Sequence, residues 1–75
     1  MILYYKPTCP FCVKVLNYAE ANNITFDLRN IEEDDAIAAE LVERGGKRQV
    51  PYLVDGETEM YESDAIIEHL DANKG

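Results

Sequence analysis

The most reactive side chains in this 75-residue sequence are two cysteines, Cys9 and Cys12, separated by Pro10 and Phe11. Thiol–disulfide exchange needs a thiolate as the attacking group, and an ordinary cysteine with a pKa near 8.5 is only about 3% ionised at pH 7. Proline favours the first position of a helix, so we expect a helix to begin at Pro10. The sulfur of Cys9 would then lie at a helix N-terminus, where unpaired N–H groups and the helix dipole stabilise negative charge.

The spacing of the pair gives each cysteine a different role. Cys9 lies at the tip of the expected helix, where it is exposed, and Lys6 adds a nearby cation. Cys12 lies one turn further along, in line with three apolar residues at helical spacing, Val15, Leu16 and Ala19. Because that face points to the core, we predict that Cys9 is the attacking thiolate and Cys12 the resolving thiol.

Other uses of the two cysteines fit the sequence less well. A disulfide between Cys9 and Cys12 closes a very short loop, so it constrains the unfolded chain little. A closed zinc site needs four ligands, whereas the chain offers two cysteines and one histidine, His69. Cys12 alone fits a role as core filler, but Cys-Pro-x-Cys after a strand and at a helix start favours redox chemistry for the pair. We expect no metal site.

Charge and hydropathy limit the partners and the compartment. The net charge of −8 argues against nucleic-acid binding. The apolar run Met1–Tyr5 ends at Lys6 and is too short for a signal peptide, and no stretch approaches the length of a membrane span. We therefore expect a cytoplasmic protein with no membrane partner, where a CxxC pair indicates redox or metal chemistry.

The hydropathy pattern of the first half predicts a strand, a helix, a strand and a helix. Met1–Tyr5 does not alternate, which indicates a strand buried on both faces. The helix that opens at Cys9-Pro10 should end at Asn22-Asn23, and residues 24–28 alternate as in a half-exposed strand. A second helix is expected over residues 32–44, with two glycines after it as a stop.

The second half predicts a β-hairpin and a last helix. Pro51–Val54 and Glu57–Tyr61 are the expected strands, and Asp55-Gly56 between them is a strong two-residue turn signal. Ser63 is the expected N-cap of the last helix. The order βαβαββα describes an α/β domain with one four-stranded mixed sheet, helices on both sides, and the first and third strands in the middle.

Three motifs in this order resemble the glutaredoxin family. Cys9-Pro10-Phe11-Cys12 follows a short strand, Val50-Pro51 matches the family's cis-proline loop, and Glu62-Ser63-Asp64 opens the last helix where the family binds glutathione. The resemblance implies a thioredoxin fold, a four-stranded mixed sheet flanked by three helices, over residues 1–75 as a single glutaredoxin domain.

The resemblance also implies how the chain would hold the cysteinyl and γ-glutamyl parts of glutathione. Val50 would pair its backbone with the cysteinyl part. Pro51, if cis, would hold that backbone open beside Cys9, although most X–Pro bonds are trans. The N–H groups of Ser63 and Asp64 would receive the γ-glutamyl carboxylate, and the carboxylate of Asp64 would meet the ammonium group.

The remaining contacts implied for glutathione include positions that depart from the family pattern. Lys6, with Arg48 or Gln49, would face the glycine carboxylate, and Phe11 would either line the groove or pack in the core. Phe11 stands where tyrosine is usual, Gln49 where threonine is common, and Glu62-Ser63 where glycine-cysteine is more usual. That last stretch is similar to the N-terminal domain of glutathione transferases, whose second, helical domain these 75 residues do not include.

The implied activity is glutathione-dependent reduction of protein–glutathione mixed disulfides and of protein disulfides. Cys9 would attack the glutathione sulfur, and a second glutathione or Cys12 would then release it. The expected partners are glutathione, as co-substrate, and glutathionylated or disulfide-bonded proteins; no tightly bound cofactor is expected, and the expected state is a monomer.

Three alternatives use the same residues differently. A glutaredoxin-like electron carrier, reduced by thioredoxin reductase and serving ribonucleotide reductase, would keep both cysteines without needing the residues assigned to the glutathione carboxylates. A dimer that shares an iron–sulfur cluster would use Cys9 and glutathione, but Pro10 argues against it because cluster-binding relatives usually carry glycine or serine there. A non-catalytic interaction domain would give Cys9 no reason to be ionised.

Overall fold

The order of helices and strands is the predicted βαβαββα in the computed structural model, which describes residues 1–73. The elements are β1 (Ile2–Tyr5), α1 (Pro10–Ala21), β2 (Asp27–Asn30), α2 (Asp35–Gly45), β3 (Tyr52–Asp55), β4 (Thr58–Tyr61) and α3 (Ser63–Asn73). Among these residues, no helix is long and apolar enough to cross a membrane.

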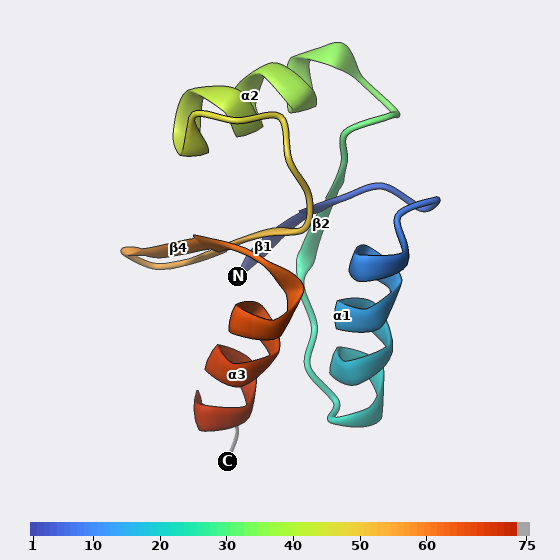
Figure 1. Ribbon diagram of the computed structural model, residues 1–75, viewed down its shortest axis with the longest axis vertical. Helices are drawn as coiled ribbons and strands as arrows, with labels where there is room; N and C mark the ends of the chain where they lie inside the picture. Colours follow the sequence, from blue (N-terminus) through green and yellow to red (C-terminus); the bar gives the residue numbers. More distant parts are fainter. Residues whose placement is uncertain (74–75) are drawn as a thin grey trace.

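The four strands form one mixed sheet in the order β2-β1-β3-β4. β1 runs parallel to β2 and antiparallel to β3, and β3 pairs antiparallel with β4. The first and third strands are therefore central, as predicted. In Figure 1, α1 and α3 lie side by side on one face of the sheet and α2 lies on the other. This arrangement confirms the expected thioredoxin fold.

The sheet separates two apolar cores. Alternate residues of β1 reach opposite sides: Leu3 packs with α1 and α3, and Tyr4 packs beneath α2, both with no exposed surface. The core beneath α1 and α3 contains Leu3, Val15, Leu53, Ile66 and Leu70. The core beneath α2 contains Tyr4, Ile31, Ala38, Leu41, Tyr52 and Val54. The prediction that the first strand is buried on both faces is thus confirmed.

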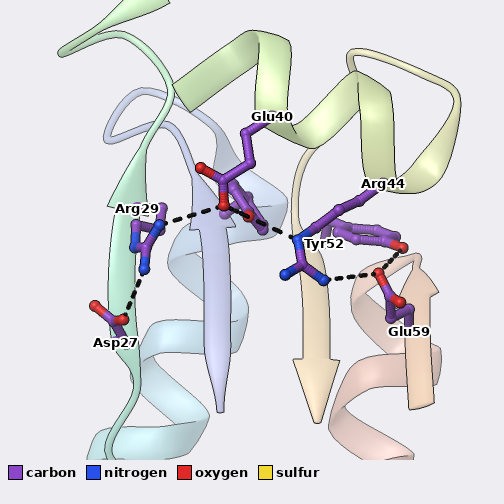
Figure 2. A network of polar contacts seen from close by, with 7 residues as sticks. Asp27, Arg29, Glu40, Arg44, Tyr52 and Glu59 are labelled. Carbon is purple, nitrogen blue, oxygen red and sulfur yellow. Dashed lines mark hydrogen bonds and ion pairs between the residues drawn. The ribbon is translucent and has the colours of Figure 1, made fainter. Parts of the chain in front are cut away.

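A polar network also fastens α2 to the sheet (Figure 2). The carboxylate of Glu40 accepts hydrogen bonds from Tyr4 and from Arg29, and it lies 3.9 Å from Nε of Arg44. Arg44 in turn lies 3.5 Å from Glu59, which also accepts a 2.8 Å hydrogen bond from the Tyr52 hydroxyl. Burial, followed by the bond to Glu40, raises the pKa of Tyr4 to about 12, so its hydroxyl stays a donor.

The predicted start of the second strand was wrong. It begins at Asp27 rather than at residue 24. Ile24 and Phe26 pack against the α1–α3 core from an extended segment that precedes the pairing with β1. Leu28, on the edge strand β2, is 47% exposed, so the alternating face packs on the core at Ile24 and Phe26 but not at Leu28.

The second helix and the hairpin turn are also displaced from their predicted positions. α2 starts at Asp35, because Asp34 caps it by accepting a 2.9 Å bond from the Ala36 N–H. The predicted glycine stop is confirmed: Gly46 has φ +89°, which suits glycine, and its N–H bonds the Val42 carbonyl. In the hairpin Asp55 pairs with Thr58, so the two turn residues are 56 and 57 rather than 55 and 56.

Candidate functional site

Three separate segments meet at a small groove of about 170 Å³. The segments are the start of α1, the loop before β3 and the start of α3. We call it the Pro51 groove, and it is lined by Phe11, Gln49, Val50, Pro51, Glu62, Ser63 and Asp64. Six of these residues are among those the sequence assigned to glutathione, and residues distant in the chain are thus brought to one place.

Cys9 occupies the N-cap of α1, at the edge of this groove. Its extended backbone (φ −87°, ψ 115°) lets its sulfur accept the Cys12 N–H at 3.4 Å. The Cys9 thiol donates to the carbonyl of Val50 at 3.9 Å, which ties it to the groove wall. Pro10 takes the first helical position, as predicted. The sulfur is partly exposed at a helix N-terminus, where a developing negative charge is stabilised.

Cys12 faces the core, as its spacing predicted. It has no exposed surface and lies on the buried face of α1 with Val15 and Ala19. Burial in these apolar surroundings raises the pKa of the Cys12 thiol to about 12, so this thiol is neutral at pH 7. Both cysteines are free. The two sulfurs therefore differ in access, which is the asymmetry that a nucleophile and a resolving thiol require.

The Val50–Pro51 peptide bond is cis, the isomer the family resemblance implied. Pro51 is fully buried, and Val50 is partly buried against the α2 core. Val50 precedes the paired residues of β3, so its backbone lies outside the sheet ladder. An extended ligand strand laid beside Val50 would meet backbone groups that the sheet does not use.

The start of α3 corrects one prediction. Ser63 is not the N-cap but the first residue of the helix, and Glu62 precedes it with φ +76°. The Glu62 carbonyl accepts the first helical bond, from the Ile66 N–H at 3.0 Å. The sequence favoured Ser63 because serine is a good cap, but the left-handed turn at Glu62 moves the cap one residue earlier. The N–H groups of Ser63 and Asp64 lie in the first turn, where intrahelical partners are lacking.

Asp64 already has a partner in the protein. Its carboxylate lies 2.5 Å from Nζ of Lys14 on α1, and the two side chains are 85% and 53% exposed. Sequence reasoning missed Lys14, because the pair spans 50 positions and no local pattern marks it. Any ligand ammonium that approaches Asp64 would meet a carboxylate already paired with a lysine.

Of three further predicted residues, one lines the groove and two do not. Phe11 is 62% exposed and lines the groove, so the alternative of core packing is wrong. Lys6 and Arg48 do not line it. Lys6 lies in the turn before α1, where its carbonyl accepts the Cys9 N–H at 3.1 Å, and Arg48 is exposed on the loop before Val50. Both are close in the chain to residues of the site, Lys6 to Cys9 and Arg48 to Val50.

No metal centre accompanies these thiols within the part of the chain that the structure describes. Among residues 1–73, no three histidine, cysteine or acidic side chains are grouped so that they could hold a metal ion.

The chain matches one known family over almost its whole length. Residues 3–75 match the protein family described as "Glutathione S-transferase, N-terminal domain". A search of the curated proteins found no match. Among solved structures, glutathione S-transferase 1-6 from Anopheles dirus species B has a TM-score of 0.84 at 27% identity, covering 100% of this chain and 36% of that one.

Two other solved structures are informative. The apo form of human glutathione-S-transferase T1-1 has a TM-score of 0.84 at 27% identity, covering 97% of this chain and 31% of that one. Glutaredoxin from Brucella melitensis has a TM-score of 0.70 at 22% identity, covering 95% of this chain and 76% of that one, a similarity of fold. The chain thus spans about a third of the transferases that it matches.

Proposed function

The chain belongs to the family of glutathione S-transferase N-terminal domains, and from this premise we propose that it is a glutathione-dependent thiol–disulfide oxidoreductase. One observation carries the proposal: a partly exposed cysteine, Cys9, caps α1 beside the Pro51 groove, and the Cys12 N–H points at its sulfur. A cysteine in that position attacks sulfur as a thiolate.

The proposed reaction begins with a protein–glutathione mixed disulfide. The Cys9 thiolate attacks the glutathione sulfur, the old disulfide breaks, and the protein leaves as a thiolate that takes up a proton. Cys9 then carries glutathione through a new disulfide. A second glutathione thiolate attacks the glutathione sulfur of that disulfide, which releases glutathione disulfide and restores the Cys9 thiolate. No oxidant or reductant other than glutathione is consumed.

We assign Cys12 a secondary part in this route. Its thiol is buried and its pKa is raised to about 12, so at pH 7 it must lose a proton before it can displace glutathione from Cys9. Resolution by a second glutathione is therefore expected to be faster. Cys12 is needed when the substrate is a protein disulfide. Cys9 first forms a mixed disulfide with the protein, and Cys12 then attacks Cys9, which frees the protein as a dithiol and leaves a Cys9–Cys12 disulfide. One glutathione attacks Cys9 and frees Cys12, and a second releases glutathione disulfide.

Glutathione would lie along the Pro51 groove, with its sulfur beside Cys9. The backbone of Val50 would pair with its cysteinyl part, and Phe11 would cover one side of it. At one end, the first-turn N–H groups of Ser63 and Asp64 suit the γ-glutamyl carboxylate, and the Asp64 carboxylate suits the ammonium group. At the other end, the residues proposed for the glycine carboxylate are Lys6, Arg48 and Gln49.

The domain extent, oligomeric state and compartment that we propose rest on the sequence and not on the geometry of the site. We propose that residues 1–75 form a single glutaredoxin domain that acts as a monomer in the cytoplasm. Its partners would be glutathione and glutathionylated or disulfide-bonded proteins, and it would have no tightly bound cofactor. Sedimentation of the purified chain over a range of concentrations tests the monomer, since a dimer would show a concentration-dependent mass.

The two cysteines provide the main test. We expect Cys9→Ser to abolish release of glutathione from a glutathionylated protein, because no sulfur remains at the edge of the groove. Cys12→Ser should keep most of that activity and lose reduction of protein disulfides. Equal loss in both variants, or activity that survives Cys9→Ser, would contradict the assigned roles.

The family match favours one other function, conjugation of glutathione to an electrophile, as a transferase performs it. There the bound glutathione thiolate attacks carbon, and Cys9 would not form a disulfide. Turnover of 1-chloro-2,4-dinitrobenzene that persists in Cys9→Ser would support the transferase. Reduction of the oxidised protein by NADPH and thioredoxin reductase, but not by glutathione, would instead support an electron carrier.

A further inference from the structure

We propose that Tyr61 is a positioning residue that sets the width of the Pro51 groove, an inference that rests on the proposed function and names a new part of the same site. Tyr61 does not line the groove. It is the last residue of β4, directly before Glu62 and Ser63 in one wall, and it binds the loop that forms the other wall.

The hydroxyl of Tyr61 makes two hydrogen bonds to the backbone of a single residue. It accepts the Lys47 N–H at 3.1 Å and donates to the Lys47 carbonyl at 2.8 Å. Lys47 lies two residues before Gln49 and three before Val50, both of which line the groove. One side chain therefore joins the two walls, and it holds the loop by its main chain whatever the loop side chains do.

Tyr61 also packs closely against the C-terminal end of α2. A Cβ atom placed on Gly45, the last residue of α2, would lie 2.1 Å from the Tyr61 hydroxyl oxygen and 2.7 Å from the ring carbon that bears it. Glycine at this position is thus required by the close approach of Tyr61. The Lys47 ammonium also lies 5.3 Å from the centre of the Tyr61 ring, within the range of a cation–π contact.

The ring itself is held by its neighbour in the sheet. Tyr61 pairs with Tyr52 across β3 and β4, and their ring centres are 4.5 Å apart. The pairing and the ring contact with Tyr52 therefore fix the direction of the Tyr61 hydroxyl, so that this hydroxyl can hold the loop in one position.

The test compares Tyr61→Phe with Tyr52→Phe. Each variant keeps a phenyl ring and removes one hydroxyl, but only the first hydroxyl reaches the loop. The assay is reduction of the Cys9–Cys12 disulfide, in which free glutathione must enter the groove to reach Cys9. Because two backbone bonds are lost, we expect Tyr61→Phe to raise the KM for glutathione in this assay by about three- to tenfold at unchanged kcat. Tyr52→Phe should leave the KM unchanged, although both variants lose thermal stability.

A second reductant separates positioning from general damage. Dithiothreitol has neither the carboxylates nor the peptide backbone of glutathione, so its rate with Tyr61→Phe should equal the wild-type rate. Gly45→Ala disturbs the same contact from the opposite side while it keeps the hydroxyl, and it should raise the KM for glutathione in the same direction. This second variant keeps the inference testable if Tyr61→Phe fails to fold.

The outcomes distinguish this inference from the function on which it rests. If the wild-type protein does not turn over glutathione at all, the proposed function fails and the inference with it. If the wild type is active but Tyr61→Phe and Tyr52→Phe have the same KM, or if Tyr61→Phe slows both reductants equally, only the role of Tyr61 is refuted.

Discussion

Replacing Lys14 by methionine is expected to strengthen glutathione binding. In the free protein the Lys14 ammonium lies 2.5 Å from the Asp64 carboxylate, the group proposed to meet the ammonium of glutathione. The two cations compete for one acceptor, so the ligand must displace or share a partner that is already there. Lys14→Met removes the competitor and leaves the aliphatic part of the side chain over the same surface.

The size of the effect follows from the exposure of the pair. The two side chains are 53% and 85% exposed, so their attraction is strongly screened by water despite the short distance. Exposed pairs of this kind contribute about 0.2–1 kcal/mol. Affinity for glutathione should therefore rise about 1.4- to fivefold, and the gain should shrink as salt is added.

The assay is reduction of the Cys9–Cys12 disulfide, in which free glutathione must enter the groove; it compares the KM for glutathione with that for an analogue that lacks the γ-glutamyl amino group. Lys14→Met should improve glutathione and leave the analogue unchanged, since the analogue brings no ammonium to Asp64. In an Asp64→Asn background the same substitution should have no effect, which completes a double-mutant cycle. Weaker binding of glutathione, or an equal gain for the analogue, would refute the competition and indicate that Lys14 itself contacts the ligand.

Two further predictions concern stability. Burial raises the pKa of Cys12 from 9.0 to about 12, so between these values the unfolded chain releases a proton that the folded chain keeps. The free energy of unfolding should therefore fall as pH rises above 9, by about 1.4 kcal/mol from this group at pH 10, and urea titrations should find that Cys12→Ser reduces the fall. Glu62→Gly should raise the free energy of unfolding by about 1 kcal/mol, because glycine adopts the left-handed φ of +76° without strain. If the same urea titration instead finds the variant less stable, the side chain of Glu62 stabilises the fold by more than its backbone strain costs.

The parts of the fold that depend on local chemistry were predictable from the sequence. Pro10 begins α1 because its ring suits the first helical position, and Gly46 ends α2 because glycine accepts a positive φ. The burial of Cys12 follows from its spacing to Val15 and Ala19 on one helical face. Each of these needs only a few neighbouring residues, so a single sequence contains the information.

The features that were missed depend on contacts between distant residues or on backbone conformation. Lys14 and Asp64 are 50 positions apart, and Tyr61 on β4 is 14 positions from Lys47 in the loop before β3. The cap at Glu62 was missed for a different reason, since its φ is set by the passage from β4 into α3 and not by its side chain. Tertiary packing decides all three, and residue type alone does not report it.

The division of the interior by the sheet has a mechanical consequence. Cys9 caps α1 and Cys12 lies on it, and α1 rests on one core. The loop that ends at Pro51 follows α2, which rests on the other core. Because the two cores are separate, transient opening of the core beneath α2 would loosen the loop that ends at Pro51 and leave the packing of α1 on the other side of the sheet intact.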